Sequence, residues 1–447
     1  MVDGQIPTRC PEMPTLSLDN LTNGPDGSCD TAIIGAGIVA LALAVRLQLE
    51  GRHVMLLDPK EPASGTSFGN AGYLSRGSIF PPASPEMMRR LPQLMLDPSG
   101  PLVIRPSYAH RMVPWGIRLM AASRPKPLSR IVEALAALCR DAVTSYRPLL
   151  AAAGAEDMID VRGSLVVCRT QATLEQKAAA IPMLRKHGIV AERIDGAEAR
   201  RMEPALATDI AGAVYFPDNA RCVSPGALGA RFAESVRAKG GTLRQTAVTK
   251  LHPQGEGWLL DTSTGPVAAR QVVVAAGRWS DELLAPLGYT IPLISERGYH
   301  LMLPRAEVSL SRPCVMAEPF FAATPMRGGL RLAGTVEFAN TDAPMNPRRS
   351  DKLYELAVPY LPGLRREGAT RWMGVRPSLP DALPAIGAAS GHRNLFYCFG
   401  HQHIGLTTAA ISAQLLADVM LQRTPSLDPA PFNLDRFRRR QSDARAA

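Results

Sequence analysis

Residues 31–59 read TAIIGAGIVALALAVRLQLEGRHVMLLDP, and this stretch decides the fold. An apolar strand is followed by a glycine turn, a helix and a second apolar strand, which is typical of a parallel βαβ unit. Gly35, Gly37 and Ala40 form the pattern G-x-G-x-x-A. The first glycine permits the tight turn, the second lets a phosphate approach the backbone, and the small third residue lets helix and strand pack closely. The stretch therefore predicts a dinucleotide site with its pyrophosphate at the helix N-terminus.

Asp58 ends the second strand about twenty residues after the glycines, where an acidic side chain accepts hydrogen bonds from the ribose hydroxyls. Its charge also disfavours a 2′-phosphate. Two dinucleotides remain open from this unit alone: a nicotinamide that dissociates, or a flavin that stays bound.

Length and charge restrict the class of protein. A chain of 447 residues is long enough for two domains. The net charge of +10 is dispersed, apart from the tail DRFRRRQSDARAA, and no basic stripe with interleaved aromatic residues of the kind that stacks bases is visible, so no nucleic acid partner is expected. The seven cysteines have no zinc or iron–sulfur spacing, which predicts reduced thiols in a cytoplasmic protein and no metal site. The first thirty residues resemble a loose leader, not a secretory signal.

Three further segments favour the flavin. Residues 64–75, SGTSFGNAGYLS, directly follow the acidic residue and offer amides and hydroxyls to a long ligand. Residues 271–284, QVVVAAGRWSDELL, form a strand that ends in small residues. Residues 376–387, RPSLPDALPAIG, precede NLFYCFGHQHIGLTTA at 394–409, which predicts a strand, a glycine turn and the start of a helix. A helix N-terminus there would stabilise the negative charge of a reduced flavin.

These segments, in this order, resemble the FAD-dependent D-amino acid oxidase superfamily, and most of all its bacterial D-amino acid dehydrogenases, from about residue 30 to residue 420. The resemblance implies a mixed α/β fold, in which a Rossmann-like FAD-binding domain carries an inserted substrate domain built on an antiparallel sheet. The expected parts are a flexible leader at 1–29, an FAD-binding domain at 30–95, 220–290 and 370–430, a substrate domain at 96–219 and 291–369, and a basic tail at 431–447.

The resemblance also implies FAD contacts throughout these motifs. The residues expected to hold FAD are Gly35, Gly37, Ile38, Asp58, Thr66, Ser67, Asn70, Ala71, Gly72, Val248, Ala276, Gly277, Gly400, His401, Ile404, Gly405, Leu406 and Thr407. One branch of the superfamily attaches FAD through a cysteine shortly before the Pro-Asp step. Here Met373, Gly374 and Val375 occupy that neighbourhood, so non-covalent FAD is expected.

The resemblance implies that a hydride passes from an amino acid Cα to flavin N5, after which water hydrolyses the imine. Arg376 matches the arginine that grips the substrate carboxylate, although an exposed arginine before a proline turn is the simpler alternative. Tyr299 and His300 are candidates to bind the substrate, or are half-buried strand residues with satisfied polar ends. His403 is expected beside the flavin and Glu337 is a weaker candidate for the same cavity, while a metal held by His401 and His403 is disfavoured.

The expected substrate is a D-amino acid, with cyclic D-proline or cis-4-hydroxy-D-proline as the finer hypothesis, and the expected acceptor is a quinone or another carrier. An oxygen-using amine oxidase and a non-catalytic FAD-binding subunit remain alternatives. Residues 87–127 mix basic and apolar side chains and either touch the inner face of the cell membrane or pack as core helices.

Overall fold

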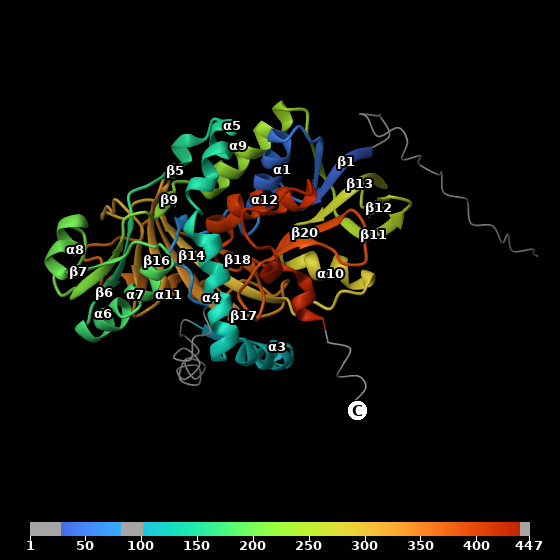
Figure 1. Ribbon diagram of the computed structural model, residues 1–447. Coiled ribbons are helices and arrows are strands. Elements are labelled where there is room, and N and C mark those ends of the chain that lie inside the picture. The colour runs from blue at the N-terminus through green and yellow to red at the C-terminus, as the bar shows by residue number, and fades with distance from the viewer. Residues whose placement is uncertain (1–27, 82–101, 439–447) are drawn as a thin grey trace, which may run out of the picture.

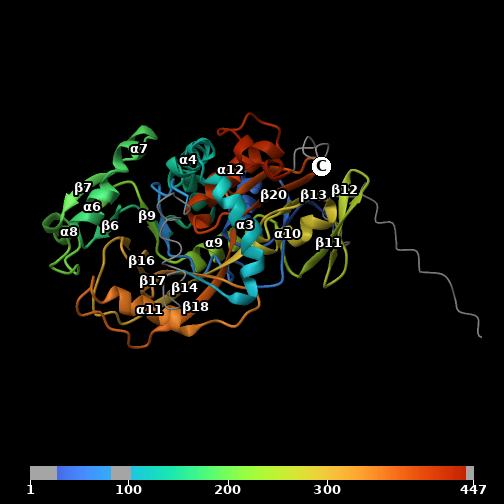
Figure 2. The same cartoon turned by 90° about the horizontal axis from the view of Figure 1, so that it is seen from below.

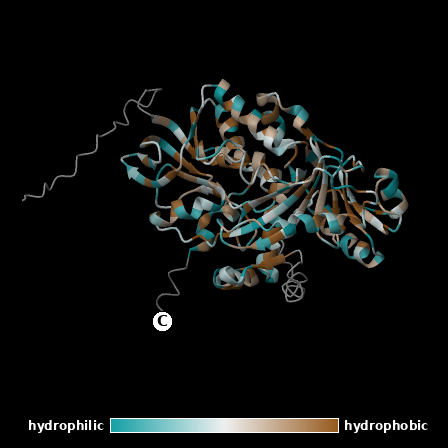
Figure 3. Cartoon of the chain, turned by 180° about the vertical axis from the view of Figure 1, so that it is seen from behind, coloured by the Kyte–Doolittle hydropathy of each residue, from teal (hydrophilic) through white to brown (hydrophobic). Residues whose placement is uncertain are grey.

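A computed structural model describes residues 28–81 and 102–438 (Figure 1). Most of the expected leader, the last residues of the expected tail, and positions 87–101 of the expected membrane segment lie outside the described residues. The protein contains two large sheets that lie side by side in space, and a small third sheet lies between them (Figure 1). Apolar residues concentrate on the strands of both large sheets (Figure 3).

The first sheet contains the βαβ unit that the sequence predicts. Its five parallel strands run in the order β10 (Thr242–Gln245), β2 (Val54–Asp58), β1 (Ser28–Ile34), β13 (Val267–Val274) and β20 (Leu395–Phe399). Antiparallel strands extend it, namely β11 (Val248–Gln254), β12 (Gly257–Thr262) and β19 (Ala385–Ala388). Because the central strands are parallel, their carboxyl ends meet at one edge, which is where ligands bind in such sheets.

One face of this sheet is covered by helices that share a single apolar core. These are α1 (Ile38–Leu49), α4 (Pro125–Arg140), α5 (Arg147–Ala153), α9 (Pro225–Ala238) and α12 (Gly405–Met420). Buried residues line nearly all of α1 and α12, because each is enclosed by the sheet and by neighbouring helices. The opposite face holds a second core with the short helix α10 (Ser280–Leu284).

The second sheet is mainly antiparallel, as expected of the substrate domain. Its strands run in the order β18 (Thr370–Ser378), β14 (Ile294–Leu303), β17 (Gly329–Phe338), β16 (Phe321–Met326), β15 (Cys314–Met316), β6 (Ser164–Cys168), β8 (Gly212–Phe216) and β7 (Glu192–Asp195). The short strand β4 (Leu102–Ile104) pairs with the end of β17. Helix α11 (Pro347–Ala357) packs on the outer face of β14 and β17, opposite the side on which α12 lies (Figure 2).

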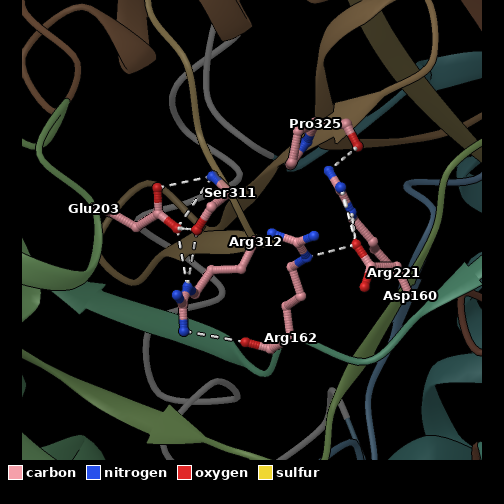
Figure 4. A network of polar contacts seen from close by, with 7 residues as sticks. All are labelled: Asp160, Arg162, Glu203, Arg221, Ser311, Arg312 and Pro325. Atoms are coloured by element: carbon pink, nitrogen blue, oxygen red, sulfur yellow. Dashed lines mark hydrogen bonds and ion pairs between the residues drawn. The ribbon is translucent and has the colours of Figure 1, made fainter.

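The small third sheet consists of β3 (Tyr73–Leu74), β9 (Ala220–Cys222) and β5 (Ile159–Asp160). A polar network connects it to the antiparallel sheet (Figure 4). Asp160 accepts from Arg221 at 3.0 Å and from Arg162 at 2.8 Å. Arg312 donates to the backbone oxygen of Arg162 at 3.0 Å and pairs with the buried Glu203 at 2.9 Å. These contacts fix the small sheet against the edge of the large one.

The proposed domain limits differ from the sheets at two places. Strand β18 lies in the antiparallel sheet, because it pairs with β14 over its whole length, although 370–430 was expected in the FAD-binding domain. Helices α4 and α5 pack with α1 and α12, although 96–219 was expected in the substrate domain. The antiparallel sheet therefore extends beyond residue 369, and the helical core of the first sheet takes in part of 96–219.

Six cysteines lie within the described residues, and all six are buried free thiols. Burial raises the pKa of Cys29, Cys139, Cys168 and Cys222 to about 12. Within 28–81 and 102–438, no helix combines the length and the apolar character that crossing a bilayer requires.

Candidate active site

The site begins at two helix N-termini on the carboxyl edge of the parallel sheet. Gly35 has φ of +109°, and a Cβ there would lie 2.5 Å from the Ala275 oxygen, so only glycine allows β1 and β13 to approach this closely. Helix α1 begins after Gly37 and α12 after Ile404, and neither has a side-chain cap. A helix N-terminus presents amides without a partner inside the helix and a positive dipole end, which suit a pyrophosphate and an anionic ring, although the first amide of α1, that of Ile38, donates to Ser67.

Asp58 is fixed at the end of β2. Its Oδ2 accepts from the Ala36 amide at 2.8 Å, and its Oδ1 accepts from the Lys60 amide at 2.8 Å. The Asp58 backbone oxygen accepts from the Thr246 amide at 2.9 Å, which brings Val248 to the same end of the sheet. A cleft of about 470 Å³, including its part open to solvent, lies here and is lined in part by Ala36, Asp58 and Lys60. Two acidic and three basic residues line it, and the Asp58 carboxylate is the type of group that accepts hydrogen bonds from ribose hydroxyls.

The loop at 64–75 connects the two sheets. Ser67 Oγ accepts from the Ile38 amide at 2.9 Å, and Thr66 Oγ1 donates to the Val375 oxygen of β18 at 2.7 Å. Asn70 Oδ1 accepts from the Gly72 amide at 2.9 Å, across Ala71. The loop therefore lies between the N-terminus of α1 and the antiparallel sheet, where a long cofactor would extend.

The segment before α12 forms another wall. Gly400 and Gln402 have positive φ values of +81° and +48°, which turn the chain sharply from β20 into the helix. His401 is buried and its Nε2 lies 3.1 Å from Ser412 Oγ, so its side chain supports α12 and does not face the cleft. Burial lowers the pKa of His401 to about 3.

The first turn of α12 is itself held in place. The backbone oxygen of Leu406 accepts from Tyr146, and Thr407 Oγ1 accepts from the Ser75 amide at 3.3 Å. These contacts fix the position at which Gly405 starts the helix. Ala276 and Gly277 follow β13 nearby, and a Cβ at Gly277 would meet nothing within 4 Å.

Arg376 lies on the face of β14 that is turned toward this loop. It packs flat on Gly298, where a Cβ would lie 2.5 Å from Cζ and 2.6 Å from Nε of the guanidinium. Its Nη1 donates to Glu296 Oε1 at 2.9 Å, and Glu296 Oε2 accepts from Ser378 Oγ at 2.6 Å. Burial opposes ionisation of Glu296, but the Arg376 charge and the Ser378 hydrogen bond lower its pKa below the usual value. Glu296 is therefore a carboxylate at neutral pH.

His403 completes this group from the α12 side. Its side chain is exposed to solvent and lies within electrostatic range of Glu296 and Arg376. Burial lowers the pKa of His403 more than the nearby Glu296 charge raises it. The imidazole is therefore neutral at neutral pH and available to accept a hydrogen bond.

Tyr299 and His300 lie on opposite faces of β14, because successive side chains of a strand alternate. His300 faces the loop at 64–75, which we call the cofactor loop. Its Nδ1 bonds to the Gly69 oxygen at 3.1 Å, and its ring stacks on Trp372 with centroids 5.0 Å apart. These contacts favour the alternative of a strand residue with a satisfied polar end, and a direct contact of His300 with the substrate stays a prediction. Burial lowers the pKa of His300 to about 4.

Tyr299 is expected either to bind the substrate or to be a strand residue with a satisfied polar end, and its contacts favour the second alternative. Its hydroxyl donates to Glu337 Oε2 at 2.5 Å on the face covered by α11. Glu337 pairs there with Arg105 at 2.8 Å and with Arg297 at 3.1 Å, so it does not share the cavity either. Burial, followed by the Glu337 contact, raises the pKa of Tyr299 to about 12.

Three residues of the site were not predicted. Glu296 could have been predicted from sequence, because side chains alternate along a strand and this places Glu296 on the same face as Gly298 and His300. Trp372 packs against Gly69, where a Cβ would overlap its ring, and Arg331 donates from Nη1 to the oxygens of Phe68 and Asn70. No local pattern shows these two contacts, because each spans more than 200 residues of sequence.

Comparison with known proteins agrees with this geometry. Residues 30–419 match the family described as FAD dependent oxidoreductase (DAO). A protein of Bradyrhizobium diazoefficiens named D-amino-acid oxidase is 34% identical over 421 residues, which cover 92% of this chain and 100% of the relative. A protein of Ralstonia nicotianae named D-amino acid dehydrogenase 2 is 30% identical, over 90% and 99% of the two chains.

Solved structures resemble the fold. The glycine oxidase of Geobacillus kaustophilus superposes with a TM-score of 0.72 at 22% identity, over 92% of this chain and 100% of that one. The L-proline dehydrogenase of P. horikoshii superposes with a TM-score of 0.70 at 16% identity, over 92% and 98%. At these identities the likeness concerns the fold alone.

Proposed function

Because the chain belongs to the family of FAD-dependent oxidoreductases, we propose that it oxidises D-amino acids at the Cα–N bond and passes the electrons to a quinone or another acceptor. One observation carries the proposal: a guanidinium, that of Arg376, lies flat against the strand face beside the cofactor loop, with hydrogen-bond donors to spare. The names of two relatives, an oxidase and a dehydrogenase of D-amino acids, support the same substrate class.

The residues at the carboxyl edge fit non-covalent FAD. The amides that begin α1 would hold the pyrophosphate, Asp58 and Val248 the adenosine, and the amides that begin α12 the flavin ring. When bound, FAD supplies the two-electron acceptor for oxidation of an amine. No cysteine precedes Pro380 closely, which supports the absence of a covalent link.

Arg376 would bind the substrate carboxylate. Its contact with Glu296 uses one donor of Nη1, and a guanidinium carries five N–H groups in a planar fork. A bidentate grip on the carboxylate would fix which hydrogen of Cα faces the flavin. Gly298 makes this position possible, because any side chain there would displace the guanidinium.

His403 would accept the proton of the substrate ammonium group. An amino acid reaches the site with a protonated nitrogen, and this nitrogen must become neutral before the adjacent carbon is oxidised. A neutral imidazole inside the cleft can accept that proton. The same ring could instead bind the hydroxyl of cis-4-hydroxy-D-proline, which is the finer substrate we propose.

A substrate panel tests the function. The purified protein with its FAD is mixed with D-amino acids, their L-enantiomers and D-proline, with an artificial dye as acceptor under nitrogen and without the dye in air. We expect reduction of the dye by D-enantiomers, with D-proline among the best, and slower turnover with oxygen. Vigorous peroxide production without dye would favour the oxygen-using alternative, and no turnover of any D-amino acid would contradict the proposal.

The acceptor, if it is a membrane quinone, requires contact with the bilayer, and helix α3 (Ala109–Ala122) supports such contact. Val113, Ile117 and Met120 lie on one side of it and are 64%, 58% and 53% exposed. Residues 102–132 carry six basic and no acidic side chains, which suits anionic lipid. We expect the protein to sediment with anionic vesicles and not with neutral ones, and Ile117→Glu to abolish this. Equal sedimentation of the variant would contradict membrane contact through α3.

A further inference from the structure

We propose that Glu296 makes the substrate pocket electrically neutral and thereby excludes D-amino acids with acidic side chains. The inference rests on the proposed function, because it deepens the assignment of Arg376 as the carboxylate anchor. It names Glu296 as a specificity-determining residue that acts through Arg376 and through its own charge.

The charges around the anchor cancel. Glu296 contributes one negative charge 2.9 Å from the positive guanidinium of Arg376, and Ser378 holds the second carboxylate oxygen at 2.6 Å. His403, the other titratable side chain assigned to this group, is neutral at neutral pH. A zwitterionic amino acid adds one positive and one negative charge, so the occupied pocket remains neutral.

Another arginine, Arg331, is buried and does not alter the balance. Arg331 lies beside Met302 in the sheet register, four residues along β14 from Gly298, or about 13 Å at the rise of a strand. Its Nη1 is bound by the oxygens of Phe68 and Asn70, which keeps the guanidinium behind the loop. His300 and Trp372 stack between it and the Arg376 group.

A second carboxylate on the substrate would therefore find no unmatched positive charge. It would lose its hydration in a partly buried pocket and would meet the negative charge of Glu296, whose side chain is only 12% exposed. Neutral side chains meet neither penalty. A basic side chain would meet both the negative charge of Glu296 and the positive charge of Arg376, which lie 2.9 Å apart, so it gains no net attraction.

D-glutamine and D-glutamate test this directly, because they have nearly the same shape and differ in charge. We expect the wild-type protein with FAD to have a kcat/KM for D-glutamine at least about tenfold above that for D-glutamate. The variant Glu296→Gln should lower the ratio of the two kcat/KM values by about tenfold or more, whereas Glu296→Asp should leave this ratio unchanged. Glu367→Gln, which removes a carboxylate 73% exposed and paired with Arg305, is the matched control and should leave the ratio unchanged.

Binding gives a second readout that needs no turnover. Propionate and succinate are titrated into the yellow protein, and the flavin absorbance reports binding. Succinate should bind at least about tenfold more weakly than propionate to the wild type, and this gap should close in Glu296→Gln. If no D-amino acid is turned over but the two carboxylates bind as expected, the proposed function is contradicted and the inference about Glu296 is supported.

Two results would overturn the inference. One is equal use of D-glutamate and D-glutamine by the wild-type protein, which requires no variant. The other is a Glu296→Gln variant with normal FAD content and unchanged ratios for both the substrates and the two carboxylates. If the variant does not fold, the wild-type comparison alone decides.

Discussion

A methyl group at Gly298 would test the placement of the carboxylate anchor without altering any charge. The Cβ of Gly298→Ala would lie 2.5 Å from Cζ of Arg376, whereas ordinary carbon contacts are about 3.5 Å. The guanidinium must therefore retreat by about 1 Å. The strand itself need not move, because φ at Gly298 is outside the left-handed region and the obstacle is the end of a flexible side chain.

A displacement of about 1 Å in a positioning group costs on the order of 100-fold in rate, or about 2.7 kcal/mol of transition-state stabilisation. We expect kcat/KM for the best D-amino acid, measured with a dye under nitrogen, to fall by about that factor in Gly298→Ala. FAD content, read from the absorbance of the purified protein, should stay unchanged. Gly116→Ala is the control, because a Cβ there meets nothing within 4 Å. Near-normal kinetics of Gly298→Ala would show that Arg376 does not bind the carboxylate in this position.

Three further predictions follow from the same geometry. Arg376→Lys should lower kcat/KM by about 30- to 1000-fold with FAD retained, since the charge remains but the planar fork is lost; a loss below threefold would remove Arg376 from the site. Acid precipitation should release free FAD into the supernatant, and flavin that stays with the protein would disprove the non-covalent link. In the folded protein the pKa of His300 is lowered to about 4. As pH falls, His300 is therefore protonated in the unfolded chain before it is protonated in the folded one. The free energy of unfolding should then lose roughly 3 kcal/mol from this group as pH falls from about 6.5 to about 4, and His300→Asn should flatten that slope.

The βαβ unit could be predicted from sequence because its signals are local. A glycine turn, an apolar helix and an acidic strand end lie within thirty residues, and the structure shows each in place at Gly35, α1 and Asp58. The placement of α4 was not predictable in the same way, because its apolar face suits either domain and only tertiary packing selects α12 as its neighbour.

The site was only partly predictable. The motif predicts that Arg376 binds the substrate; the structure places it against Gly298 and Glu296 of β14, and its role stays a prediction. Tyr299 and His300 are alternatives for a substrate contact, and they lie on opposite faces of β14 because adjacent strand residues alternate. Glu296 was missed because its importance comes from pairing with a strand eighty residues later in the chain.

The six buried thiols have a consequence for the durability of the protein. Peroxide oxidises the thiolate, and a thiol whose pKa is about 12 is ionised in only about one molecule in 100,000 at pH 7. Any peroxide that leaks from turnover in air would thus find these cysteines unreactive. Prolonged turnover in air should leave them countable with a thiol reagent after unfolding, and oxidative damage should concentrate on side chains such as Met120, which is 53% exposed.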